Sequence, residues 1–105
     1  MSFTAGNLAL KEQREVERDL VHYRARGFGP DARALSLLVV NISPHGLMVR
    51  CDTEYQVGQR IRVTLPIVGV VVAEIRWSLG GRMGCNFDQP IDRASYYDLL
   101  AAMLK

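Results

Sequence analysis

Two groups of polar residues in this chain have side chains suited to binding an anion. In the first, Arg14 and Arg18 stand four residues apart, just before the first segment with a β-strand pattern. Two guanidinium groups at this spacing can converge on one anion or on the edge of a base, and each charge-assisted hydrogen bond contributes about 1.5–3 kcal/mol. For an isolated R-x-x-x-R, a solvated pair offset by Glu15 and Glu17 explains the same spacing better, so the spacing alone is weak evidence for a binding site.

The second group is the segment 41–46, Asn-Ile-Ser-Pro-His-Gly, which joins two apolar segments. Because strand side chains alternate between faces, Asn41 and Ser43 are expected on the same face. Gly46 permits a turn with positive φ or a close approach of the backbone to a ligand. An Asx or Ser turn that only ends the strand explains these residues equally well. Together, the two groups have the guanidinium forks, side-chain oxygens and close backbone approach that a phosphorylated guanine ligand requires.

The composition is that of one folded domain. The chain has 105 residues, of which 49% are hydrophobic and 23% charged, enough for one core but not for two. Its net charge of +2 does not favour nucleic acid or an anionic membrane as a partner. Cys51 and Cys85 lie in apolar alternating segments, which indicates reduced, buried thiols without a metal or catalytic role. With no apolar run of membrane-spanning length and no export signal, we expect a cytoplasmic protein that does not insert into a membrane.

The hydrophobic pattern predicts six strands and one terminal helix. We expect residues 1–19 to form a polar arm that is mobile without a ligand, with 8–16 able to form a turn or two of helix. The flexible arm proper covers 1–11 and the folded domain covers 12–105. Strands are predicted over 20–28, 34–42, 47–52, 60–65, 70–77 and 83–87, and a helix over 92–104.

Several local patterns support these elements. The segment 34–42 is nearly all apolar, as in a strand buried on both faces or lying under a helix. Strict alternation places Trp77 on the same face as Ala73 and Ile75. Asp92 has the position of a helix N-cap. Short strands at close intervals favour an all-β fold, a six-stranded antiparallel barrel whose open face or end is covered by the C-terminal helix.

Together with this barrel pattern, the two polar groups resemble the PilZ domain family of bacterial cyclic di-GMP receptors. That family pairs an R-x-x-x-R motif with a [D/N]-x-S-x-x-G motif further along the chain, and both motifs are complete here. The segments 57–63, 73–77 and 84–87 are similar to other strands and turns of the family. The resemblance covers roughly residues 12–104, which is nearly the whole chain.

The resemblance implies a site and a mechanism. Arg14 and Arg18 would clamp guanine and phosphate of cyclic di-GMP from the N-terminal arm, while Asn41, Ser43 and Gly46 hold the nucleotide from the barrel surface. The arm would close over the ligand and change the surface shown to an unidentified protein effector. The protein would be a monomer or weak dimer that requires no cofactor or metal besides this ligand.

The remaining candidate residues have smaller roles. Gln13 stands where many relatives have arginine, which favours one ligand per site, and His45 lies in a turn where it can touch the ligand or simply be exposed. His22 has no second ligand at metal spacing. Trp77 fits a core or rim aromatic better than a base-stacking platform. No serine, cysteine or aspartate has a credible base partner, so we do not expect an enzyme.

Two other functions stay open. A ligand-free interaction module with the same fold is the first alternative, and the two complete motifs argue against it. An OB-like binder of single-stranded nucleic acid is the second, and it needs a basic groove with several exposed aromatic side chains. The low net charge and the aromatic content of 8% argue against that function.

Overall fold

The computed structural model describes residues 18–104 of the chain. The flexible arm expected over 1–11, the helical turns expected over 8–16, and the residues Gln13 and Arg14 lie outside the described residues. The folded domain expected over 12–105 is described from residue 18 onward, and this part carries the barrel and the helix.

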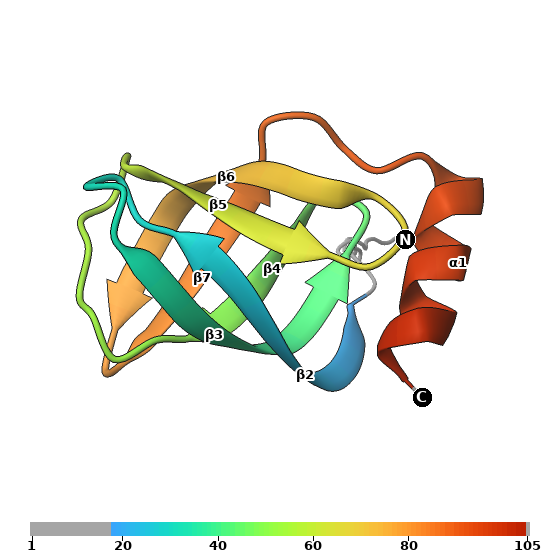
Figure 1. Ribbon diagram of the computed structural model, residues 1–105, viewed down its shortest axis with the longest axis horizontal. Coiled ribbons are helices and arrows are strands. Elements are labelled where there is room, and N and C mark those ends of the chain that lie inside the picture. The colour runs from blue at the N-terminus through green and yellow to red at the C-terminus, as the bar shows by residue number, and fades with distance from the viewer. Residues whose placement is uncertain (1–17, 105) are drawn as a thin grey trace, which may run out of the picture.

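Six antiparallel strands form a closed barrel in the order β2-β3-β4-β7-β6-β5 (Figure 1). The strands are β2 (Asp19–Phe28), β3 (Ala34–Ser43), β4 (Gly46–Arg50), β5 (Arg60–Leu65), β6 (Gly69–Leu79) and β7 (Arg82–Phe87). Closure leaves no unpaired sheet edge in this part of the chain. The predicted six-stranded antiparallel barrel is therefore confirmed, and its strands agree with the predicted segments to within a few residues.

Alternating side chains fill the barrel. On β5, Ile61, Val63 and Leu65 are at most 2% exposed, whereas the residues between them are exposed. The alternation predicted for this strand is confirmed. The prediction for β3 was wrong in part, because Ala34 and Ser36 at its start are exposed. This half of β3 has one face in the core and one on the outer wall of the barrel, and no helix within residues 18–104 covers it.

Two register irregularities change which face the following residues occupy. In β3 the partners step from Val39↔Val49 to Asn41↔Met48, so one residue of β3 is left over. In β6 they step from Ile75↔Cys85 to Trp77↔Gly84. Each bulge shifts the later side chains to the other face. Trp77 therefore lies on the outer face, and the predicted sharing of one face with Ala73 and Ile75 was wrong.

The two glycines of the β6–β7 hairpin confirm the expected tight turn. Gly80 and Gly81 have φ values of 62° and 79°, as both central residues of a type I′ turn require. The hairpin lies at the end of the barrel away from the helix (Figure 1).

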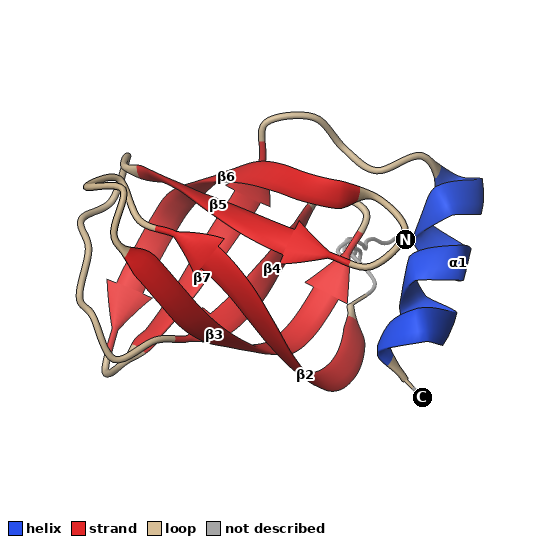
Figure 2. Ribbon diagram, viewed as in Figure 1, coloured by secondary structure: helices blue, strands red, loops and turns tan. Residues whose placement is uncertain are grey.

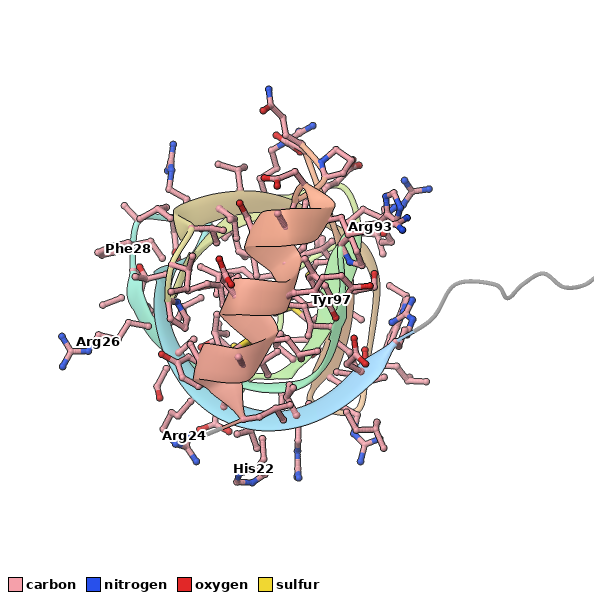
Figure 3. All side chains as sticks on the ribbon, turned by 90° about the vertical axis from the view of Figure 1, so that its right-hand side faces the viewer. His22, Arg24, Arg26, Phe28, Arg93 and Tyr97 are labelled. Atoms are coloured by element: carbon pink, nitrogen blue, oxygen red, sulfur yellow. The ribbon has the colours of Figure 1, made fainter. Side chains whose placement is uncertain are left out.

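Helix α1 (Arg93–Met103) closes the other end of the barrel (Figure 2). Its N-cap is Asp92, as predicted, and the Asp92 side chain accepts a hydrogen bond from the Ser95 N–H at 3.1 Å. Leu99 and Met103 of α1 are buried. Seen from this end, α1 runs across the ring of strands (Figure 3). Of the helices in the described part of the chain, none is long and apolar enough to cross a membrane.

Candidate functional site

The two polar motifs meet at the start of β2. The Arg18 guanidinium donates a hydrogen bond from Nη1 to Asn41 Oδ1 at 3.1 Å, across 23 residues of sequence. Asp19 and Leu20, which follow Arg18, pair with Ile42 and Asn41 of β3. The β2–β3 pairing therefore brings the second arginine of the first motif to the first residue of the second motif.

Asn41 is a buried polar side chain on the outer wall of the barrel. It is 9% exposed, and its two amide atoms are both engaged. Oδ1 accepts from Arg18, while Nδ2 lies 3.8 Å from the Met48 sulfur, which is a weak acceptor. The β3 bulge places Asn41 on this wall, since uninterrupted alternation with Val39 would direct it into the core.

Ser43 and the following turn form a compact polar corner. The Ser43 hydroxyl accepts from the His45 N–H at 3.2 Å, so the Ser turn that was considered from the sequence is present. The Pro44 and His45 carbonyls accept from Ile91 N and Phe87 N, both at 2.8 Å. Ser43 is buried and the His45 residue is exposed, as expected for a turn histidine. These bonds attach the second motif to the end of β7 and to the segment that leads into α1.

Gly46 is required by packing against β7. Its φ does not lie in the positive region where Gly58 and Gly69 are found. A Cβ at Gly46 would overlap the Cys85 carbonyl oxygen of β7. The positive-φ turn offered as one role for this glycine was wrong, and the close approach that needs a glycine is to a neighbouring strand.

A row of paired residues runs from this corner across five strands. Cross-strand partners connect Leu20 to Asn41, Asn41 to Met48, Met48 to Gly84, and Gly84 to Trp77. The Trp77 indole lies over the backbone of Gly84, where a Cβ would overlap its Nε1. Trp77 is 38% exposed. The row continues the outer wall from the Arg18–Asn41 pair to an exposed aromatic ring. Sequence alternation did not predict this position of Trp77, because the β6 bulge interrupts the alternation.

The residue after Arg18 connects this corner to helix α1. The Tyr96 hydroxyl donates toward Asp19 Oδ2 at 2.5 Å and toward the Ile42 carbonyl at 3.0 Å, so one phenol proton serves two acceptors. Burial, and then the hydrogen bond to Asp19, raise the pKa of Tyr96. Helix α1 is thus attached to β2 at the residue that follows the first motif, and to β3 within the second motif.

Two cavities differ in their suitability for an anion. A cavity of 450 Å³ is lined by four valines of the β5–β6 region together with Asp88 and Asp92, and it has no arginine in its lining. A cavity of 250 Å³ lies between the barrel and α1, lined by Asp19, Pro44, Arg93, Tyr96, Tyr97 and Leu100. The smaller cavity adjoins the candidate site, because Asp19 and Pro44 follow Arg18 and Ser43 directly.

The other predicted site residues are placed as follows. Gln13 and Arg14 lie outside the described residues, so only Arg18 represents the first motif in the structure. Arg18, Asn41 and Ser43 lie together at the corner, and Gly46 lies on the neighbouring strand. Within residues 18–104, no three histidine, cysteine or acidic side chains are grouped so that they could hold a metal ion.

Comparison with known families gives one match. A family model described as the PilZ domain matches residues 12–105, nearly the whole chain. Comparison with curated proteins gives no match.

Proposed function

Because the chain belongs to the PilZ domain family, which generally binds cyclic di-GMP, we propose that this protein is a cyclic di-GMP receptor. Domains of this family are binding modules rather than enzymes, and they interact with proteins. The protein would act as an adaptor without its own catalytic activity, exposing a changed surface to a protein effector once the nucleotide is bound.

The hydrogen bond between Arg18 and Asn41 is the observation that carries this proposal. A guanidinium donates from five N–H groups, and the bond to Asn41 Oδ1 uses only one of them. The remaining donors suit a phosphate oxygen or the O6 and N7 atoms of guanine. Asn41 thus holds the second arginine of the first motif at the barrel wall, and Arg14 would approach from the preceding segment to complete the clamp.

The outer wall supports a bound nucleotide beside this clamp. Adjacent strands lie about 4.8 Å apart, so Met48 and Gly84 are roughly 5 and 10 Å from Asn41 along the row. Met48 is half-buried and adaptable, and the Trp77 ring offers a partly exposed aromatic surface. One base of the dinucleotide would lie along this row, with its phosphates near Arg18 and Ser43.

Binding would then be transmitted through β2 and α1. Arg18 and Asp19 are consecutive, and Asp19 accepts from Tyr96 on the helix that closes the barrel. A ligand that binds the remaining donors of Arg18 changes the surroundings of the start of β2 and hence the contact between β2 and α1. The proposed change takes place within one protein chain and needs no cofactor besides the nucleotide. We propose that the protein acts in the cytoplasm.

Calorimetric titration of the full chain with cyclic di-GMP tests the proposal. Arg14→Ala and Arg18→Ala should each weaken binding about 10- to 100-fold, the equivalent of one charge-assisted interaction. Arg82→Ala, a matched change at an exposed arginine at the start of β7, should leave affinity unchanged. A folded wild-type protein that gives no binding heat would contradict the proposal and favour the ligand-free interaction module.

A further inference from the structure

The cavity between α1 and the barrel has chemistry that the two motifs do not account for. Three parts of the fold line the cavity. Strand β2 contributes Asp19, the turn contributes Pro44, and helix α1 contributes Arg93, Tyr96, Tyr97 and Leu100. Its volume of 250 Å³ is below the usual range of about 300–1,000 Å³ for drug-sized ligands. It suits one flat ring system rather than a whole dinucleotide.

Three of the lining residues match the three recognition surfaces of a guanine base. A carboxylate accepts from the N1–H and N2–H donors of guanine, a guanidinium donates to O6 and N7, and an aromatic ring packs on the base face. In this cavity Asp19 supplies the carboxylate, Arg93 the guanidinium and Tyr97 the aromatic ring. Adenine presents an acceptor at N1 and a donor at N6, so the same set of groups does not suit it.

The placement of these side chains supports this assignment. Arg93 and Tyr97 are four residues apart, hence on one face of α1, and both lie on the side of the helix toward the start of β2 (Figure 3). Both residues are exposed, Tyr97 by 60%, so its ring is accessible. The Tyr96 hydroxyl bonds to Asp19 Oδ2 and so orients this carboxylate. A carboxylate has about four lone-pair sites, so it can accept further hydrogen bonds from a base.

We infer that this cavity is a guanine subsite of the nucleotide site, in which Asp19, Arg93 and Tyr97 bind one base of the cyclic dinucleotide. The inference rests on the proposed cyclic di-GMP binding, and it specifies that α1 contacts one guanine base of the ligand. Cyclic di-GMP has two guanines, and the second base would lie along the outer wall toward Trp77. Helix α1 would thereby be part of the binding site as well as the cover of the barrel.

Calorimetry with two ligands tests the subsite. Wild-type protein should bind cyclic di-GMP at least about 10-fold more tightly than cyclic di-AMP, because a site built to hydrogen-bond guanine leaves polar groups unpaired with adenine. Arg93→Ala and Tyr97→Ala should each weaken cyclic di-GMP binding about 10-fold and reduce the preference for guanine. Arg82→Ala is again the matched control, and it should change neither value. Arg82 is the first residue of β7, and the β6–β7 hairpin that precedes it lies at the end of the barrel away from α1 (Figure 1).

The outcomes separate this inference from the proposed function. If wild-type protein binds cyclic di-GMP and both α1 variants bind it as tightly as Arg82→Ala does, the subsite is wrong and the receptor function stands. If wild-type protein does not bind cyclic di-GMP, both are overturned. Because the two α1 residues are exposed, the variants should fold, and unchanged circular dichroism and melting temperature check this. Arg93→Gln repeats the test with the longer side chain if Arg93→Ala does not fold.

Discussion

The indole of Trp77 lies across the backbone of Gly84, on the outer wall of the barrel and in one row with Asn41. This relationship exists because a bulge in β6 shifts Trp77 out of the alternation that leads from Ala73 to Ile75. Only a residue without a side chain leaves room for the ring at this point of β7. An exposed aromatic surface thus stands on the same wall as the polar motifs.

Trp77 should report ligand binding by its fluorescence. It is the one tryptophan of the chain, and it is 38% exposed, so a base placed against it changes its surroundings. Adding cyclic di-GMP should change the emission in a saturable way, with the same dissociation constant as calorimetry gives. Arg18→Ala should shift the saturation to about 10- to 100-fold higher concentrations. Calorimetric binding without any change in emission would show that the ligand does not reach this part of the wall.

Gly46→Ala should destabilise the fold before any ligand is added. The new methyl group would overlap the Cys85 carbonyl oxygen and force β4 and β7 apart, and overpacking of this kind costs about 1–3 kcal/mol. Urea denaturation of the ligand-free protein measures the change. Ser43→Ala, which removes only the hydroxyl that accepts from His45 N, is the comparison and should cost less. If Gly46→Ala weakened nucleotide binding and left stability unchanged, the packing role would be refuted.

Tyr96→Phe should weaken the attachment of α1 to β2 and β3. The substitution removes the phenol proton that Tyr96 shares between the Asp19 carboxylate and the Ile42 carbonyl, and a buried acceptor that loses its donor costs about 1–3 kcal/mol. Denaturation should show this loss of unfolding free energy, and amide exchange should become faster in α1. Tyr97→Phe, at an exposed neighbouring ring, should have little effect on either measurement. Equal stability of the two variants would argue against the Tyr96 contact as an anchor.

Stability should fall at alkaline pH. Burial, and then the neighbouring Cys51, raise the pKa of Cys85 from 9.0 to about 12. Below pH 9 the thiol is protonated in both states, and its contribution is complete. Between pH 9 and 12 the unfolded chain loses the proton while the folded chain keeps it, so the free energy of unfolding falls by at most about 1.4 kcal/mol per pH unit from this group.

Urea denaturation at pH 8 and above pH 10 measures this dependence. The raised pKa values of Tyr55 and Tyr96 act in the same direction, so part of the slope should remain in any cysteine variant. Cys85→Ala should show a shallower fall than the wild type. An identical slope in that variant would mean that Cys85 ionises equally in the folded and unfolded chains.

Much of the fold follows from local sequence. Alternation is a property of extended backbone, so the core-facing residues of β5 could be assigned directly. Gly80 and Gly81 specify a turn with positive φ, and Asp92 caps α1 through the N–H of a residue three positions later. These features depend on neighbours a few residues away, which is why the spacing of residues was enough to predict them.

The sequence was enough to propose which residues form the candidate site, and not to predict their geometry. The types and spacing of Arg14, Arg18, Asn41 and Ser43 led to the hypothesis of an anionic guanine ligand. Only the tertiary structure decided that Arg18 bonds to Asn41 and that Gly46 accommodates a neighbouring strand. The bulge that places Asn41 on the outer wall depends on pairing between strands, as does the bulge that exposes Trp77. Pairing between distant segments is set by the packing of the whole barrel, so the local pattern of either strand does not contain it.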